Sequence, residues 1–136
     1  MLKININQGK RYVFKTHVNE ILLPREKAES IEAFNVIIEP GQYTHMHVHE
    51  DTEQLYHVTS GRGRGVFEHA NGQREEFEMV PGDVIHVPRN TRHQIFCAGS
   101  ERLTYLCVDG FPLGKPASEP TWDHHYQAVV ALQKKS

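Results

Sequence analysis

Short stretches of alternating hydrophobic and polar residues run through most of the chain, separated by turn-forming pairs. Typical turn signals are Asn71-Gly72, Pro81-Gly82 and Gly99-Ser100. Asn71-Gly72 suits a type I′ turn joining residues 65–69 to residues 74–79. The intervening runs are rich in Val, Ile, Phe and Tyr, and they predict strands at 33–39, 43–49, 54–59, 65–69, 74–79, 83–87, 94–97 and 102–109. Many short strands at this spacing predict an all-β antiparallel sandwich or barrel.

The C-terminal part of the chain follows a different pattern. Residues 111–120 carry three of the seven prolines, which predicts an irregular strap. Thr121 is then placed to cap a helix from Trp122 to about Gln133. At helical spacing, the buried side of this helix would carry Trp122, Tyr126, Val129 and Val130.

Composition narrows the class of protein. A chain of 136 residues predicts a single domain, 1–136, and 38% hydrophobic with 24% charged residues is ordinary for a globular protein. A net charge of -2 gives no strong attraction to nucleic acid or anionic membrane. No apolar run approaches the ~18 residues of a membrane span, and the N-terminus has no long apolar leader. We therefore expect a cytoplasmic protein with a small-molecule partner, without nucleic-acid or membrane partners.

The two cysteines, Cys97 and Cys107, are consistent with the expected cytoplasmic location. The turn at residues 98–100 predicts a hairpin that sets Cys97 opposite Leu103 and away from Cys107. A disulfide between them is not expected, and two free thiols are typical of a reducing compartment.

Histidine is the notable bias, with 10 copies. Residues 43–49 alternate strictly, so His45, His47 and His49 would project from one face of a strand. Imidazole is the commonest metal ligand, and neighbours on one face are close enough to share an ion. A His-x-His pair also occurs by chance, so this spacing alone leaves a metal site and an ordinary surface equally open. Isolated histidines such as His17 and His69 are more simply explained as surface or hydrogen-bonded residues.

The order of the surrounding residues favours the metal site. Gly41, His47, His49, Gln54 and Gly61 together closely resemble the first motif of the cupin superfamily. Pro81-Gly82-Asp83, Pro88, Asn90 and His93 resemble the second, with Asn90 at a position usually held by glycine. The resemblance covers about residues 34–110. It implies an antiparallel jelly-roll barrel (a double-stranded β-helix), to which residues 111–136 add the strap and a short C-terminal helix. It also implies a metal ion in the barrel mouth, bound by His47, His49 and His93.

The fourth ligand departs from the usual glutamate of that family. Gln54 stands at this position, directly after Glu53. If Gln54 points inward, Tyr56 and Val58 do so as well, and Leu55 faces outward. Glu53 could take the role only through a bulge, so we favour Gln54 and keep Glu53 as the alternative.

The ligand set guides the functional hypotheses. Three neutral imidazoles and a neutral amide would leave the full charge on one divalent ion of zinc, iron, manganese, nickel or cobalt. That set favours Lewis-acid chemistry over redox cycling. The first hypothesis is a metal-dependent isomerase or cyclase acting on a small polar carbonyl or hydroxy compound, such as a sugar, uronate or polyketide-like molecule. His45 could serve as its catalytic proton shuttle, or only hydrogen-bond a ligand or water.

Two other classes of function stay open. Many metal-binding members of the resembled family are dioxygenases, and a non-catalytic module that binds a metal or small ligand also agrees with the motifs. In each case we expect a homodimer, in which residues 4–14 add a strand to the partner and cover an exposed sheet edge.

Overall fold

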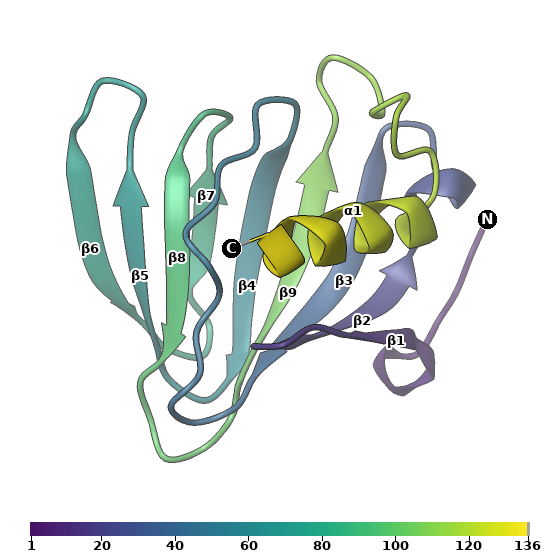
Figure 1. The fold of residues 1–136 in the computed structure, drawn as a ribbon. Coiled ribbons are helices and arrows are strands. Elements are labelled where there is room, and N and C mark those ends of the chain that lie inside the picture. Colours follow the sequence, from purple (N-terminus) through teal and green to yellow (C-terminus); the bar gives the residue numbers. More distant parts are fainter. Residues whose placement is uncertain (136) are drawn as a thin grey trace.

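The protein folds into two antiparallel β-sheets that face each other, with one helix lying across the open side between them (Figure 1). The structure, a computed structural model, describes residues 1–135. Its strands are β1 (Lys10–Val13), β2 (Val18–Leu23), β3 (Ile31–Ile38), β4 (Glu53–Ser60), β5 (Gly63–Glu68), β6 (Arg74–Met79), β7 (Val84–Val87), β8 (Arg92–Cys97) and β9 (Leu103–Gly110). Helix α1 spans Trp122–Lys135, and 3-10 turns occupy Ile6–Gln8 and Arg25–Lys27.

The larger sheet has the strand order β1-β2-β3-β9-β4-β7, and the smaller one has the order β6-β5-β8. Inward-facing side chains of both sheets form one hydrophobic core. Its fully buried members include Ile38 and Val58 from the larger sheet and Met79 and Ile95 from the smaller one. The predicted jelly-roll barrel with a C-terminal helix is therefore confirmed.

Strand β2 was not predicted from the sequence. Asn19 and Glu20 follow its first residue and interrupt the hydrophobic pattern, yet both are buried. Glu20 is tied to the neighbouring strand by an ion pair with Arg11, 3.1 Å between Nε and Oε2. A strand that buries polar side chains next to each other does not show the alternation on which the prediction depended.

The prediction of a regular strand at 43–49 is wrong. This segment runs beside β8 in an extended conformation, but it makes only isolated bridges, Tyr43 with Phe96 and His47 with His93. Between them, the amide of Ile95 donates to the Thr44 hydroxyl at 3.0 Å. A side chain thus takes the place of a backbone acceptor and interrupts the ladder.

Two turn predictions also need correction. The β5–β6 hairpin exists, but of its two expected turn residues only Gly72 has a positive φ, at 87°, whereas a type I′ turn needs positive φ at both. The amide of Gly72 bonds to the carbonyl of His69 at 2.9 Å, which places Ala70 and Asn71 at the centre of the turn.

The expected hairpin between 94–97 and 102–109 does not form. Strand β8 pairs with β5, and β9 pairs with β3 and β4 in the other sheet. The segment between them crosses from one sheet to the other. The hairpin from which we predicted that Cys97 and Cys107 do not form a disulfide is therefore absent. Cys97 and Cys107 are nevertheless both free and buried, as expected.

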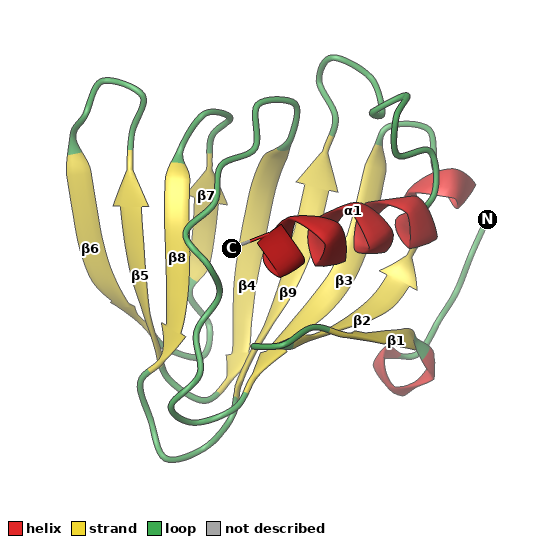
Figure 2. Cartoon of the chain, viewed as in Figure 1, coloured by secondary structure: helices red, strands yellow, loops and turns green. Residues whose placement is uncertain are grey.

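Helix α1 follows the sequence prediction closely (Figure 2). The Thr121 hydroxyl accepts from the amide of His124 at 3.2 Å and caps the helix. Trp122 is only 1% exposed, and its ring packs 4.7 Å from that of Phe34 on β3. Tyr126 is half-buried on the same side and donates a hydrogen bond to the carbonyl of Val13. None of the described helices is long and apolar enough to cross a membrane.

Candidate metal centre

Three histidines converge inside the barrel mouth. His47 and His49 come from the extended segment before β4, and His93 comes from β8. The bridge between His47 and His93 sets their rings side by side, with 4.1 Å between centroids. The potential ligand nitrogens of the three residues all lie within 4.8 Å of one another. Small side-chain rotations would bring three nitrogens at this spacing onto one ion.

Backbone carbonyls orient two of the three rings. Nδ1 of His47 lies 2.6 Å from the carbonyl oxygen of His45, and Nδ1 of His93 lies 2.9 Å from that of Thr91. Each Nδ1 therefore carries the proton and donates it, which leaves Nε2 with a free lone pair. In the part of the chain that is described, Nε2 of His93 is buried without a partner. Burying a nitrogen without a hydrogen-bond partner costs folding free energy, and a bound metal ion would remove that cost. The residues therefore fit the metal ion that the sequence predicted.

The protonation states also suit metal binding. Burial lowers the pKa of His93 to about 3, with the nearby His47 as the next cause. Burial also lowers the pKa of His47, and that of His49 lies well below its ordinary value for the same reason. All three rings are thus neutral near pH 7, as metal ligands must be.

Gln54 faces the interior and Glu53 faces outward, as the strand phase predicted. Gln54 is 5% exposed, whereas the Glu53 carboxylate pairs on the surface with Nε2 of His86 at 2.6 Å. Nε2 of Gln54 donates to Oδ1 of Asp109 at 2.8 Å, and the Tyr56 hydroxyl donates to Oε1 of Gln54 at 2.7 Å. These two hydrogen bonds determine the orientation of the Gln54 amide. Its oxygen keeps a second lone pair, with which it could bind a metal ion.

Behind Gln54 lies a buried charged chain that the sequence did not reveal. Nε and Nη2 of Arg25 donate to the two carboxylate oxygens of Glu32 at 2.7 and 3.0 Å, and Glu32 in turn contacts Asp109. Burial, followed by the adjacent Asp109, raises the pKa of Glu32 to about 9. Glu32 therefore keeps its proton near neutral pH, next to the Arg25 guanidinium.

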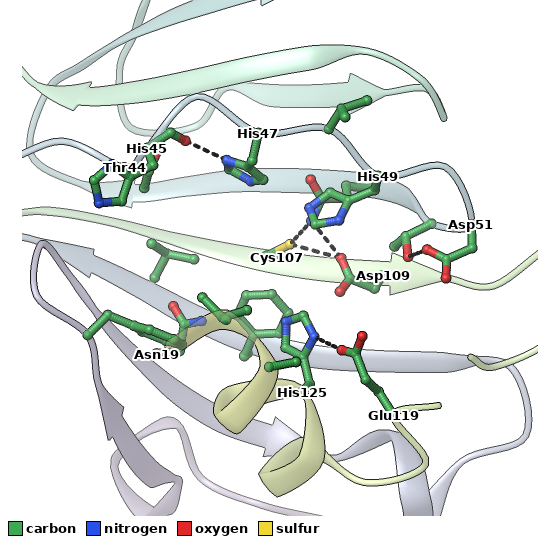
Figure 3. Close-up of a pocket in the computed structure, with 18 of the residues that line it drawn as sticks. Asn19, Thr44, His45, His47, His49, Asp51, Cys107, Asp109, Glu119 and His125 are labelled. Atoms are coloured by element: carbon green, nitrogen blue, oxygen red, sulfur yellow. Dashed lines mark hydrogen bonds and ion pairs between the residues drawn. The ribbon is translucent and has the colours of Figure 1, made fainter. Parts of the chain in front are cut away.

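His47 and His49 line a cavity of about 980 Å³ between the sheets and α1, and His93 lies buried behind them. Gln54 also lines this cavity. His45 lines it as well, but its ring is exposed and does not belong to the three-histidine cluster. Figure 3 shows His125 on the helix facing His49 across this cavity.

A family model described as the cupin domain matches residues 34–109. The chain belongs to the cupin family.

An uncharacterised protein of Methanocaldococcus jannaschii is 29% identical over 88% of this chain and 94% of its own length. The glucose-6-phosphate isomerase of Thermococcus gammatolerans is 28% identical over 47% of this chain and 34% of the isomerase. Among solved structures, the oxalate decarboxylase of Lactobacillus farciminis in a formate complex superposes on this chain with a TM-score of 0.71 and 25% identity. The superposition covers 81% of this chain and 33% of the decarboxylase. This cupin thus spans about a third of the length of those two named enzymes.

Several cavity residues of this cupin lie outside the family match, and sequence reasoning missed them. His17 lines the cavity, where burial lowers its pKa to about 4. Asn19 also lines it, and Oδ1 of Asn19 is buried without a partner among residues 1–135. Glu119 and His125 close the opposite side from the strap and the helix. A His-x-His pattern identifies ligands that share a strand, but no local pattern marks residues that only packing brings to the site.

Proposed function

We propose that this cupin binds one divalent transition-metal ion through His47, His49, His93 and Gln54 and isomerises a small, polar hydroxy-carbonyl compound. The observation that carries the proposal is the convergence of three neutral imidazoles, one with a buried unpartnered Nε2, at a roomy cavity. Zinc, iron, manganese, nickel and cobalt all suit imidazole with an amide oxygen.

The hydrogen bonds of Gln54 support its place as the fourth ligand. Because Nε2 is committed to Asp109, the oxygen is the amide atom left to face an ion. When bound, the ion would supply a Lewis acid that polarises a carbonyl group and acidifies the neighbouring C–H bond. A ligand set without a carboxylate keeps the ion's charge undiminished and strengthens that polarisation.

The charges of the cavity favour a substrate without a phosphate group. Among the described residues that line it, Arg25 is the only Lys or Arg. Its Nε and Nη2 donate to Glu32, and its Nη1 donates to the carbonyl oxygen of Glu119 at 3.0 Å. Three of its five N–H groups are thus already bonded within the protein, and the side chain is almost fully buried, so a phosphate ester would find no exposed cation in the cavity. The unpartnered Oδ1 of Asn19 would instead accept a hydrogen bond from a substrate hydroxyl. A neutral sugar or a related hydroxy ketone fits these features.

The remaining sequence-based expectations belong to the same proposal. His45, at the exposed rim, is one candidate for proton transfer. Residues 1–136 would act as one domain within a homodimer in the cytoplasm, where the two buried free cysteines stay reduced. Strand β1 already pairs with β2 of its own chain, so a partner would have to meet its other edge. A monomeric mass in light scattering would overturn the dimer.

The experiment combines elemental analysis with a substrate comparison. The purified protein should contain about one transition-metal ion per chain, and NMR should show conversion of neutral aldose–ketose pairs but slower conversion of their phosphate esters. An oxygen electrode run in parallel tests the dioxygenase alternative. Protein without bound metal, or metal-loaded protein that converts none of the sugars, would overturn the proposal. Oxygen uptake with phenolic substrates would indicate the dioxygenase, and tight retention of a sugar without conversion would indicate a binding module.

A further inference from the structure

Across the cavity from the three histidines, the strap and helix α1 bring together a second pair of ionisable side chains. Nδ1 of His125 lies 2.5 Å from Oε1 of Glu119. The two side chains are 23% and 28% exposed, so both are sheltered but reachable from the cavity. We infer that His125, oriented by Glu119, is the acid–base residue that moves the proton in the proposed isomerisation. This inference rests on the proposed function and names a residue of its reaction.

The hydrogen bond to Glu119 determines which nitrogen can act. A carboxylate accepts only, so Nδ1 of His125 donates to it, and Nε2 then carries the lone pair. Nothing in the described part of the chain binds that Nε2. A histidine oriented by a carboxylate, with its other nitrogen open to the cavity, has the arrangement of a general base.

The rest of the fold holds this pair in place. The backbone carbonyl of Glu119 accepts a hydrogen bond from Arg25, whose side chain is 3% exposed. The His125 ring packs against Trp122, with 5.0 Å between ring centroids, and Trp122 is almost fully buried. Glu119 and His125 are thus anchored to the same buried cluster. Little reorganisation would be needed before proton transfer.

The position of His125 relative to the metal centre also fits. Figure 3 shows its ring projecting from the helix toward the space in front of His49, on the opposite side of the cavity. His47, His49 and His125 all line the same cavity. A molecule bound at the histidine cluster would therefore face His125 across this cavity. Asn19, drawn on the same side as His125, adds its unpartnered oxygen for a hydroxyl group.

The chemical step balances without an outside reactant. Nε2 of His125 takes the proton from the carbon that bears the hydroxyl group next to the carbonyl. The C–H electron pair forms a carbon–carbon double bond, and the carbonyl pair moves onto its oxygen. Return of the proton to the former carbonyl carbon, with the hydroxyl proton passing to the other oxygen, gives the isomer. No net oxidation or reduction takes place.

His124 provides a matched control because it is the neighbouring histidine on the same helix. Its Nδ1 lies 2.6 Å from the Thr121 hydroxyl, its side chain is exposed, and it does not line the cavity. Adjacent residues on a helix do not share a face. A variant at this position changes the histidine content of α1 without touching the proposed reaction.

The first experiment measures deuterium uptake by D-fructose and D-glucose in D₂O, followed by proton NMR with metal-loaded protein. His125→Gln should lower the exchange rate by about 10²–10⁴-fold, the usual contribution of a general base, while the bound metal stays stoichiometric. Glu119→Gln should lower the rate less, and His124→Gln should leave it unchanged. Added imidazole should partly restore exchange to His125→Gly, which also shows that the variant is folded.

The second experiment does not depend on turnover. Nitrogen-15 NMR of the histidine side chains should find neutral His125 with its proton on Nδ1, and Glu119→Gln should mix the two tautomers. A proton on Nε2 in the wild-type protein, or normal exchange by His125→Gln, would overturn the role of His125 alone. Metal-loaded wild-type protein that exchanges no proton with either sugar would overturn the proposed function and the role of His125 with it.

Discussion

Nε2 of Gln54 donates a hydrogen bond to Oδ1 of Asp109, 2.8 Å away, across the ladder that joins β4 to β9. The two residues are register partners in this ladder and both are buried. Together with the bond from Tyr56 to Oε1, this contact determines which way the amide points. The orientation of the candidate fourth ligand is therefore set by its neighbours before any ion arrives.

Gln54→Leu should weaken metal binding by about 10–100-fold, because it removes both the proposed ligand and its two oriented hydrogen bonds. The measurement is a competition titration with a chromogenic chelator. Glu53→Gln is the matched control, since Glu53 faces the surface and pairs with His86. Equal loss of affinity in the two variants would contradict the assignment of Gln54.

His93→Ala should abolish stoichiometric metal, because His93 provides the buried nitrogen that has no protein partner. Elemental analysis of the purified variant tests this directly. His57→Ala serves as the control, because His57 is exposed on the outer face of β4. A variant lacking His93 that still carries one ion per chain would contradict the metal centre.

The metal-free protein should be most stable near pH 6.5. His17 and His93 have folded-state pKa values of about 4 and about 3, both lowered mainly by burial. Below pH ~6.5 the unfolded chain binds protons that the folded protein does not, so stability falls as pH falls toward 4. The titration of Glu32 has the opposite effect on the pH dependence of stability. Its folded pKa, raised to about 9 mainly by burial, makes stability fall as pH rises from about 4.5 toward 9.

Urea unfolding of the metal-free protein between pH 5 and pH 9 measures this profile. Each group can contribute a slope of at most about 1.4 kcal/mol per pH unit. Glu32→Gln should remove much of the decline above pH 6.5, and His17→Asn should reduce the decline below it. A profile that rises steadily to pH 9 in the wild-type protein would show that Glu32 is ionised in the fold.

Trp122→Ala should destabilise the protein by about 3–5 kcal/mol, the usual effect of removing a large buried aromatic side chain. The loss should be accompanied by faster amide exchange in α1, since Trp122 joins the helix to Phe34 and Tyr12. Denaturant unfolding and hydrogen exchange give the two readouts. Leu132→Ala is the control because this side chain is 68% exposed. Protection of α1 that survives in Trp122→Ala would show that other contacts hold the helix.

Side-chain alternation is a local property of the chain, and it determined much of the site. It placed Gln54 inside and Glu53 outside, and the resemblance to the cupin motifs pointed to His47, His49 and His93. The N-cap at Thr121 was also readable, because a cap depends on residues within one helical turn.

The tertiary structure decided what depends on distant partners. Pairing of β8 with β5, rather than with β9, cannot be read from a turn between two strands. The buried chain from Arg25 through Glu32 to Asp109 joins three separate segments, and each residue alone resembles a surface charge. His125 lines the cavity because Trp122 packs against Phe34 and holds α1 over the barrel. Local periodicity thus determined which side chains face inward, while long-range packing decided which of them meet.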